Sequence, residues 1–136
     1  MINTNRCRNA AAAVLTLLST TFFTQTLFAG EKMGLAVSVN LASRVASGDL
    51  ATARNGSAFD TKSRIGCAIN QENTVVCTAI NSTGENAVCS RYQADQSWAN
   101  AVLNLTSDGY ISFFWNEAGT CTSIYVEKSS RWAPKR

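Results

Sequence analysis

Residues 109–128 constrain the fold more than any other part of this chain. They contain two segments rich in aromatic and β-branched residues, separated by the short polar segment 116–119. This pattern is typical of a β-hairpin with a loop of about four residues. Because side chains alternate along a strand, Ile111, Phe113 and Trp115 share one face of the first arm. The hairpin must therefore cover a core with at least one of its faces.

The remaining residues add further strand patterns divided by turn-forming residues. Apolar and polar residues predict strands over 35–41, 64–69, 74–80 and 86–90. Residues 74–80 are apolar on both faces, which predicts a central position in a sheet. Residues 42–54 are small and polar, and we expect a further strand or an irregular edge there. The predicted fold is mainly β: a small antiparallel β-sandwich or barrel of about seven strands with at most one short helix.

Residues 90–105 depart from the β pattern, because their apolar residues recur at helical spacing. Ser90 and Gln93 have the spacing of a capping box, which marks the start of a helix. We expect a helix that ends near Ala101 and is followed by a strand over residues 102–106. A loop that leads directly into that strand is the alternative.

The N-terminal segment has the composition of a secretory signal peptide. A basic start precedes an apolar run, and small residues end the segment. We expect cleavage after Ala29 or Gly30, with a later site at Ala36 and an uncleaved anchor as alternatives. The run is too short and too polar for a membrane span. The predicted division is a signal peptide over residues 1–30 and one secreted β domain over residues 31–136.

Export would also change the charge of the chain. The full chain carries 12 Lys and Arg against 9 Asp and Glu, and removal of Arg6 and Arg8 leaves 10 against 9. A chain so close to neutrality offers no electrostatic case for binding nucleic acid. We also expect no stable membrane insertion after cleavage, and a secreted or periplasmic location.

The number and spacing of the cysteines are consistent with export. Cys7 lies in the predicted signal peptide, and the four that remain are Cys67, Cys77, Cys89 and Cys121. An even number in a short exported chain predicts two structural disulfides, and the spacing lacks the close pairs typical of zinc or redox sites. Hairpin symmetry places Cys77 opposite both Cys67 and Cys89. We predict Cys67–Cys77 and Cys89–Cys121, with Cys77–Cys89 and Cys67–Cys121 as the alternative.

The chain contains no histidine, which excludes Ser-His-Asp and Cys-His nucleophiles and histidine-bound metals. Paired carboxylates remain conceivable as catalysts of glycoside hydrolysis. However, nearly all the acids fall in predicted turns, where they commonly bond to the local backbone. We therefore expect no catalytic residue, metal or cofactor, and no enzymatic activity. The acids considered are Asp49, Asp60, Glu72, Glu85, Asp95, Asp108 and Glu117.

Aromatic residues are the remaining candidates for function. Consecutive aromatic residues in the first arm of the hairpin present bulk on both faces, and we expect a sandwich that covers both. In the alternative, an exposed aromatic patch binds a sugar or a protein. The leading interpretation is a non-enzymatic exported module of the bacterial envelope or the outside medium that recognises a protein or glycan. A small secreted carboxylate-dependent hydrolase or toxin is the alternative. The candidate partner-binding residues are Trp115, Asn116, Glu117 and Tyr125.

Overall fold

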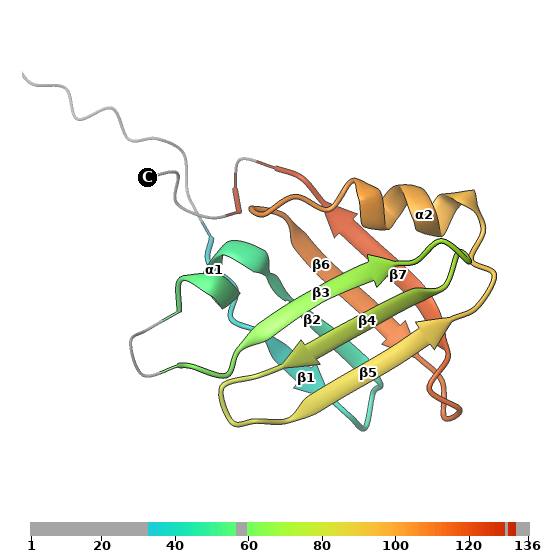
Figure 1. Cartoon of the computed structure of the whole chain (residues 1–136). Coiled ribbons are helices and arrows are strands. Elements are labelled where there is room, and N and C mark those ends of the chain that lie inside the picture. Colours follow the sequence, from blue (N-terminus) through green and yellow to red (C-terminus); the bar gives the residue numbers. More distant parts are fainter. Residues whose placement is uncertain (1–32, 57–59, 130, 133–136) are drawn as a thin grey trace, which may run out of the picture.

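Two antiparallel β-sheets packed face to face make up most of the molecule (Figure 1). The computed structural model describes residues 33–56, 60–129, 131 and 132. One sheet has the strand order β1-β2-β6-β7, and the other has the order β3-β4-β5. The prediction of a mainly β, sandwich-like fold with seven strands is confirmed. The predicted signal peptide over residues 1–30 lies outside the described residues.

The predicted hairpin forms half of the four-stranded sheet. Its loop is closed by Asn116, whose carbonyl accepts a hydrogen bond from the Gly119 amide at 3.0 Å. The Asn116 side chain also accepts one from the Thr120 amide, at 2.9 Å. Gly119 has a φ of 73°, which a residue without Cβ adopts at little cost. The strands of this sheet are β1 (Ser38–Asn40), β2 (Val45–Asp49), β6 (Tyr110–Trp115) and β7 (Cys121–Glu127).

Two successive hairpins make the three-stranded sheet, which consists of β3 (Arg64–Ile69), β4 (Val75–Ile80) and β5 (Asn86–Arg91). Asparagine side chains stabilise both turns. Asn70 Oδ1 accepts from the Thr74 amide at 2.9 Å, and Asn81 Oδ1 accepts from the Glu85 amide at 2.9 Å. Each strand lies within one residue of its predicted range, and β4 is central, as its apolar residues on both faces predicted.

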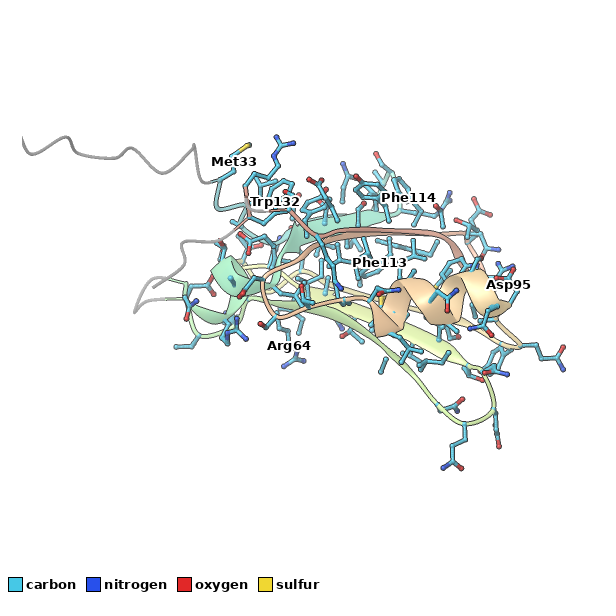
Figure 2. All side chains as sticks on the ribbon, turned by 90° about the horizontal axis from the view of Figure 1, so that it is seen from above. Met33, Arg64, Asp95, Phe113, Phe114 and Trp132 are labelled. Carbon is cyan, nitrogen blue, oxygen red and sulfur yellow. A yellow bond between two sulfur atoms is a disulfide. The ribbon has the colours of Figure 1, made fainter. Side chains whose placement is uncertain are left out.

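The core lies between the two sheets, and strand alternation decides which side chains enter it. Ile111 and Phe113 of β6 are fully buried, as are Val75 and Cys77 of β4. Figure 2 shows Phe113 directed between the sheets and Phe114 directed away from them. The predicted core face of the hairpin is therefore confirmed. The expectation that both faces are covered is wrong, since Phe114 is 41% exposed.

Among the residues described, two helices form, α1 (Leu50–Arg54) and α2 (Gln96–Leu103), so the prediction of at most one short helix is wrong. Helix α1 follows β2 directly, within the segment for which we expected a strand or an irregular edge. The buried Asp49 side chain caps this helix by accepting from the Thr52 amide at 2.9 Å. It also accepts from the Leu35 amide at 3.2 Å, which joins the chain before β1 to the helix.

Helix α2 begins at a different cap from the predicted one. Ser90 belongs to β5 and Gln93 has a φ of 50°, so the predicted capping box is wrong. Asp95 is the N-cap instead, and its side chain accepts from the amides of Ser97 and Trp98. The helix then continues to Leu103, so the strand expected over residues 102–106 does not form. Burial of Trp98 and other apolar side chains on one helix face explains the longer helix.

Substitution of Asp95 tests whether this residue caps the start of α2. Hydrogen bonds from Ser97 and Trp98 hold the pKa of Asp95 below its ordinary value. A lowered carboxylate pKa stabilises the fold above the unfolded-state pKa, and this contribution is lost as the pH falls through the folded-state pKa. We expect Asp95→Ala to lower the urea midpoint at pH 7, and Asp95→Asn, which keeps a capping oxygen, to lower it less.

Urea titrations of the three proteins at pH 7 and at about pH 2 check this prediction. The difference between the wild type and Asp95→Asn should shrink at the lower pH, because the wild-type carboxyl is then protonated. A wild-type midpoint for Asp95→Ala at pH 7 would show that Asp95 does not stabilise the helix.

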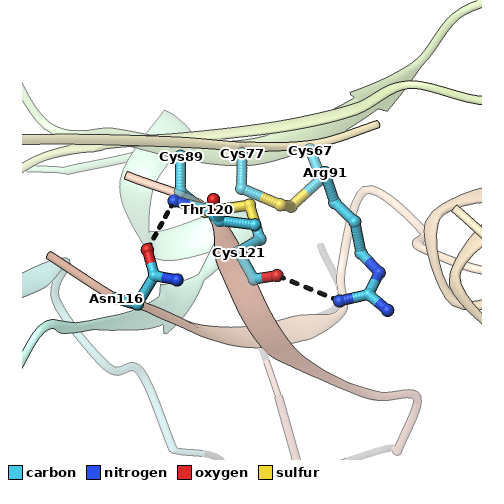
Figure 3. Close-up of a disulfide and its surroundings, with 7 residues drawn as sticks. All are labelled: Cys67, Cys77, Cys89, Arg91, Asn116, Thr120 and Cys121. Atoms are coloured by element: carbon cyan, nitrogen blue, oxygen red, sulfur yellow. Dashed lines mark hydrogen bonds between the residues drawn. A yellow bond between two sulfur atoms is a disulfide. The ribbon is translucent and has the colours of Figure 1, made fainter. Parts of the chain in front are cut away.

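The two disulfides are those predicted. Cys67–Cys77 joins β3 to β4 with Cα atoms 4.0 Å apart, and Cys89–Cys121 joins β5 to β7 of the other sheet with Cα atoms 5.1 Å apart. Figure 3 shows both disulfides lying together between the sheets. Two disulfides fit an extracellular or otherwise oxidising compartment. Within the described residues, no helix has the length and apolar character needed to cross a membrane.

Candidate functional site

A row of hydroxyl groups crosses the outer face of the four-stranded sheet. Strand register places Ser38 of β1 opposite Ser47 of β2, and Ser47 opposite Ser112 of β6. The row ends at β7, where Ser112 lies opposite Tyr125. Paired residues project to the same face of a sheet, so the three serines stand side by side. The exposure of the row falls along it: Ser38 is exposed, Ser47 is partly buried and Ser112 is buried.

Aromatic rings border this row. Tyr125 is 54% exposed at one end of the serine row, and Phe114 stands beside the row on β6. Tyr110, on the other side of the row, makes an edge contact with Tyr125 at 6.3 Å and stacks on Trp132 at 4.7 Å between ring centroids. In Figure 2, Phe114 and Trp132 lie on the same side of the sheet. We call this surface the hydroxyl-aromatic face; it consists of Ser38, Ser47, Tyr110, Ser112, Phe114 and Tyr125.

Both ends of the described chain hold one edge of this face in place. The Met33 amide donates to the Arg131 carbonyl at 2.7 Å, and Met33 forms a parallel bridge with Trp132. The Arg131 guanidinium lies 5.0 Å from the centre of the Trp132 ring, within the range of a cation–π contact. Tyr110 is thus fixed between two rings before any ligand arrives, which lowers the entropic cost of binding.

The structure separates the four residues that the sequence suggested for partner binding. Trp115 is partly buried on the inner face, with its ring 5.9 Å from that of Phe113. Asn116 and Glu117 lie in the hairpin loop, where Glu117 pairs with Arg44 at 2.5 Å. Tyr125 lies on the opposite, outer face of the sheet. The four residues therefore do not form one continuous patch, and a role for any of them in binding stays a prediction.

Tyr110, Phe114 and the serine row were missed as site residues. Alternation along the hairpin placed Tyr110 and Phe114 together on the face opposite Phe113, and this was the available signal. The serine row has no such signal, because Ser38, Ser47 and Ser112 become neighbours only through the pairing of β2 with the distant β6.

Several of the carboxylates that were considered as catalysts, and not expected to act as such, are engaged in local structure. Asp49 and Asp95 cap the two helices, and Glu85 accepts from the Asn81 side chain at 2.6 Å. Asp60 accepts from the side chain and amide of Ser63, and these hydrogen bonds lower its pKa. These contacts assign the acids to turns and caps. Glu127 is different, because it lies opposite Tyr110 on the outer face of the sheet and accepts a hydrogen bond from the Tyr125 hydroxyl at 3.4 Å. The hydroxyl-aromatic face therefore has one carboxylate at its border.

We also examined whether the side chains that commonly bind metals lie close together. Among the described residues, the one group of at least three cysteine or acidic side chains close enough for a metal ion consists of Cys77, Cys89 and Cys121. All three sulfurs are held in disulfides, so none is available as the thiolate that a metal requires. The arrangement is therefore a structural staple.

Comparison of the chain with protein-family models, with curated proteins and with solved structures gave no match. What the hydroxyl-aromatic face binds is therefore inferred from its own residues.

Proposed function

We propose that this protein is an exported, non-enzymatic binding module that recognises a glycan on the hydroxyl-aromatic face. The observation that carries the proposal is the row of three serines, exposed at Ser38, partly buried at Ser47 and buried at Ser112, beside the exposed rings of Phe114 and Tyr125. Serine hydroxyls donate and accept hydrogen bonds, as sugar hydroxyls do. Aromatic rings offer flat apolar surface to the C–H groups of a sugar ring. Export is supported by the predicted signal peptide and by the two disulfides.

A glycan suits this face better than a protein partner does. Stable protein interfaces bury about 800 Å² per partner and have an apolar centre. On the hydroxyl-aromatic face, the exposed large apolar side chains are Phe114 and Tyr125, and the serine row, with its exposed end at Ser38, lies beside them. A row of hydroxyl groups with apolar borders matches a ligand that alternates hydroxyl and C–H groups. A partner with a continuous apolar surface would leave the serine hydroxyls without hydrogen bonds, at a cost in affinity.

We expect Tyr125→Ala and Phe114→Ala each to weaken glycan binding about tenfold, which corresponds to roughly 1.4 kcal/mol. Both rings are exposed, so their removal should leave the fold intact. Val88→Ala is the matched control, because Val88 is a 52% exposed apolar residue on the outer face of the other sheet. A glycan array with the full chain, produced under oxidising conditions, identifies the ligand, and titration calorimetry measures its affinity for each variant.

Two results would contradict this proposal. The first is an array on which the wild type retains no glycan. The second is a bound glycan whose affinity is the same for the wild type, Tyr125→Ala and Phe114→Ala. A pull-down from envelope extract completes the test. A protein captured by the wild type and lost in both variants would assign the same face to a protein partner.

A further inference from the structure

A second surface, separate from the hydroxyl-aromatic face, lies between α2 and β7. Two adjoining hollows of about 380 and 250 Å³ lie along this line and share Ser97 and Ala101 in their walls. The larger hollow extends to Val126 and Lys128, and the smaller one lies over Ile124. Because the hollows share these wall residues and follow β7, the edge strand of the four-stranded sheet, we describe them as one groove. Figure 1 shows α2 beside the end of β7.

Helix α2 presents a separate stripe of small and polar residues to this groove. Ser97, Asn100, Ala101 and Asn104 line it, and their spacing of three, four and seven residues places them on one side of the helix. The apolar stripe of the same helix, which includes Trp98, is buried against the core. The short side chains of Ser97 and Ala101 leave the groove open.

Strand β7 supplies the opposite wall, and it is an edge strand. Within the described residues, its ladder of hydrogen bonds is with β6. An edge strand directs about half of its backbone N–H and C=O groups away from its partner. A helix cannot satisfy these groups, because its own backbone hydrogen bonds are internal. At the start of β7, Arg91 of β5 donates to the Cys121 carbonyl at 3.4 Å, so it is the later part of the strand that can accept another extended chain.

The charge of the groove favours an acidic occupant. Lys128 stands at one end, is exposed, and makes no ion pair with the other described residues. No acidic side chain lines either hollow. The groove is therefore positive at one end and polar along the helix side. Val126 and Ile124 add partly buried apolar surface on the strand side.

We propose that this groove binds an extended peptide that adds to β7 as a fifth strand, with a carboxylate of the peptide beside Lys128. Main-chain hydrogen bonds to β7 would supply affinity, and the asparagines of α2 would contact the peptide's other edge. The carboxylate belongs either to the C-terminus of the peptide or to an acidic side chain. A glycan could not complete the ladder, because it lacks the regular alternation of N–H and C=O groups.

A displayed library of random octapeptides, half with free and half with blocked C-termini, tests the proposal with the full chain. Selected peptides should bind Ala101→Trp at least about tenfold more weakly, because the indole would fill the groove. Lys128→Glu, an exposed change that does not threaten folding, should weaken binding several-fold. Amidation of the C-terminus, compared with replacement of acidic side chains by amides, identifies which carboxylate contacts Lys128.

Leu103→Ala is the matched control, since Leu103 is a 72% exposed residue of α2 outside the groove. It should bind the peptides as the wild type does, and so should Phe114→Ala on β6, which separates this site from the hydroxyl-aromatic face. Two sets of peptides are methylated on alternate backbone nitrogens, one set at odd and the other at even positions. In an added strand only one of these sets of N–H groups points toward β7, so methylation should abolish binding in one set and be tolerated in the other.

Three outcomes would overturn the proposal. The library yields no binding peptide; the selected peptides bind Ala101→Trp and Lys128→Glu as they bind the wild type; or methylation is tolerated in both sets. Sedimentation of the chain without peptide tests whether a second copy of the chain occupies the groove instead. A dimer that Ala101→Trp dissociates, together with no peptide binding, would assign the groove to a second copy of this chain.

Discussion

Replacing Cys89 and Cys121 together by alanine is expected to lower the free energy of unfolding by about 4 kcal/mol. The bond joins residues 32 positions apart in the sequence, so its loss restores much conformational freedom to the unfolded chain. It is also the disulfide that joins the two sheets, and both residues are buried in the core. Urea unfolding of the oxidised protein, followed by tryptophan fluorescence, measures the change.

The Cys67→Ala and Cys77→Ala double variant is the internal comparison. Its bond joins residues only 10 positions apart within one sheet, so we expect a smaller loss of about 3 kcal/mol. The order of the two double variants is the discriminating result. If loss of the Cys67–Cys77 bond were the more damaging, the closed-loop argument would fail for this protein.

The pairing of these cysteines illustrates how far local sequence patterns can lead. Both turns that flank β4 were predicted correctly, and their symmetry placed Cys77 opposite Cys67 and Cys89 alike. The strand register confirms this symmetry, because Cys77 of β4 lies opposite Cys67 of β3 and also opposite Cys89 of β5. What decides the pairing is Cys121, which reaches Cys89 from the opposite sheet (Figure 3). The packing of one sheet on another leaves no local signal in the sequence.

The predictions of the two helices were wrong for a different reason. Helix α1 has five residues, too few for an apolar repeat to be visible, although Asp49 before an alanine-containing segment was an available capping signal. At α2 the cap predicted at Ser90 did not form, and Asp95 caps the helix instead. Ser90 could not cap a helix because it extends β5, where it lies opposite Val76 of β4. Strand pairing outweighed a local preference there.

The sequence pattern also predicted only part of the candidate site. The hairpin pattern placed Phe114 on one face and Phe113 on the other, which the structure confirms. It could not decide which of these faces a second layer covers. We expected cover on both, and the smaller sheet covers one. Trp115 was suggested for binding because it is aromatic and adjoins a polar loop, yet it faces the core from beyond a bulge at the end of β6.

The burial of neighbouring residues on β6 permits a sharp test of this assignment. Phe113→Ala is expected to lower the free energy of unfolding by about 3–5 kcal/mol, because it removes a fully buried ring and leaves a cavity in the core. Phe114→Ala removes the same atoms from the adjacent position, where the ring is 41% exposed, and should cost about 1 kcal/mol or less.

A small domain has only about 5–15 kcal/mol of stability, so Phe113→Ala can leave too little for measurement. Phe113→Leu keeps the volume of the core more nearly constant and should cost about 1.5 kcal/mol or less. Phe113→Ala is thus expected to be the most destabilising of the three variants. Equal losses for the two alanine variants would mean that both faces of β6 are covered. The hydroxyl-aromatic face would then be closed to any ligand, because binding there requires Phe114 to stand in solvent.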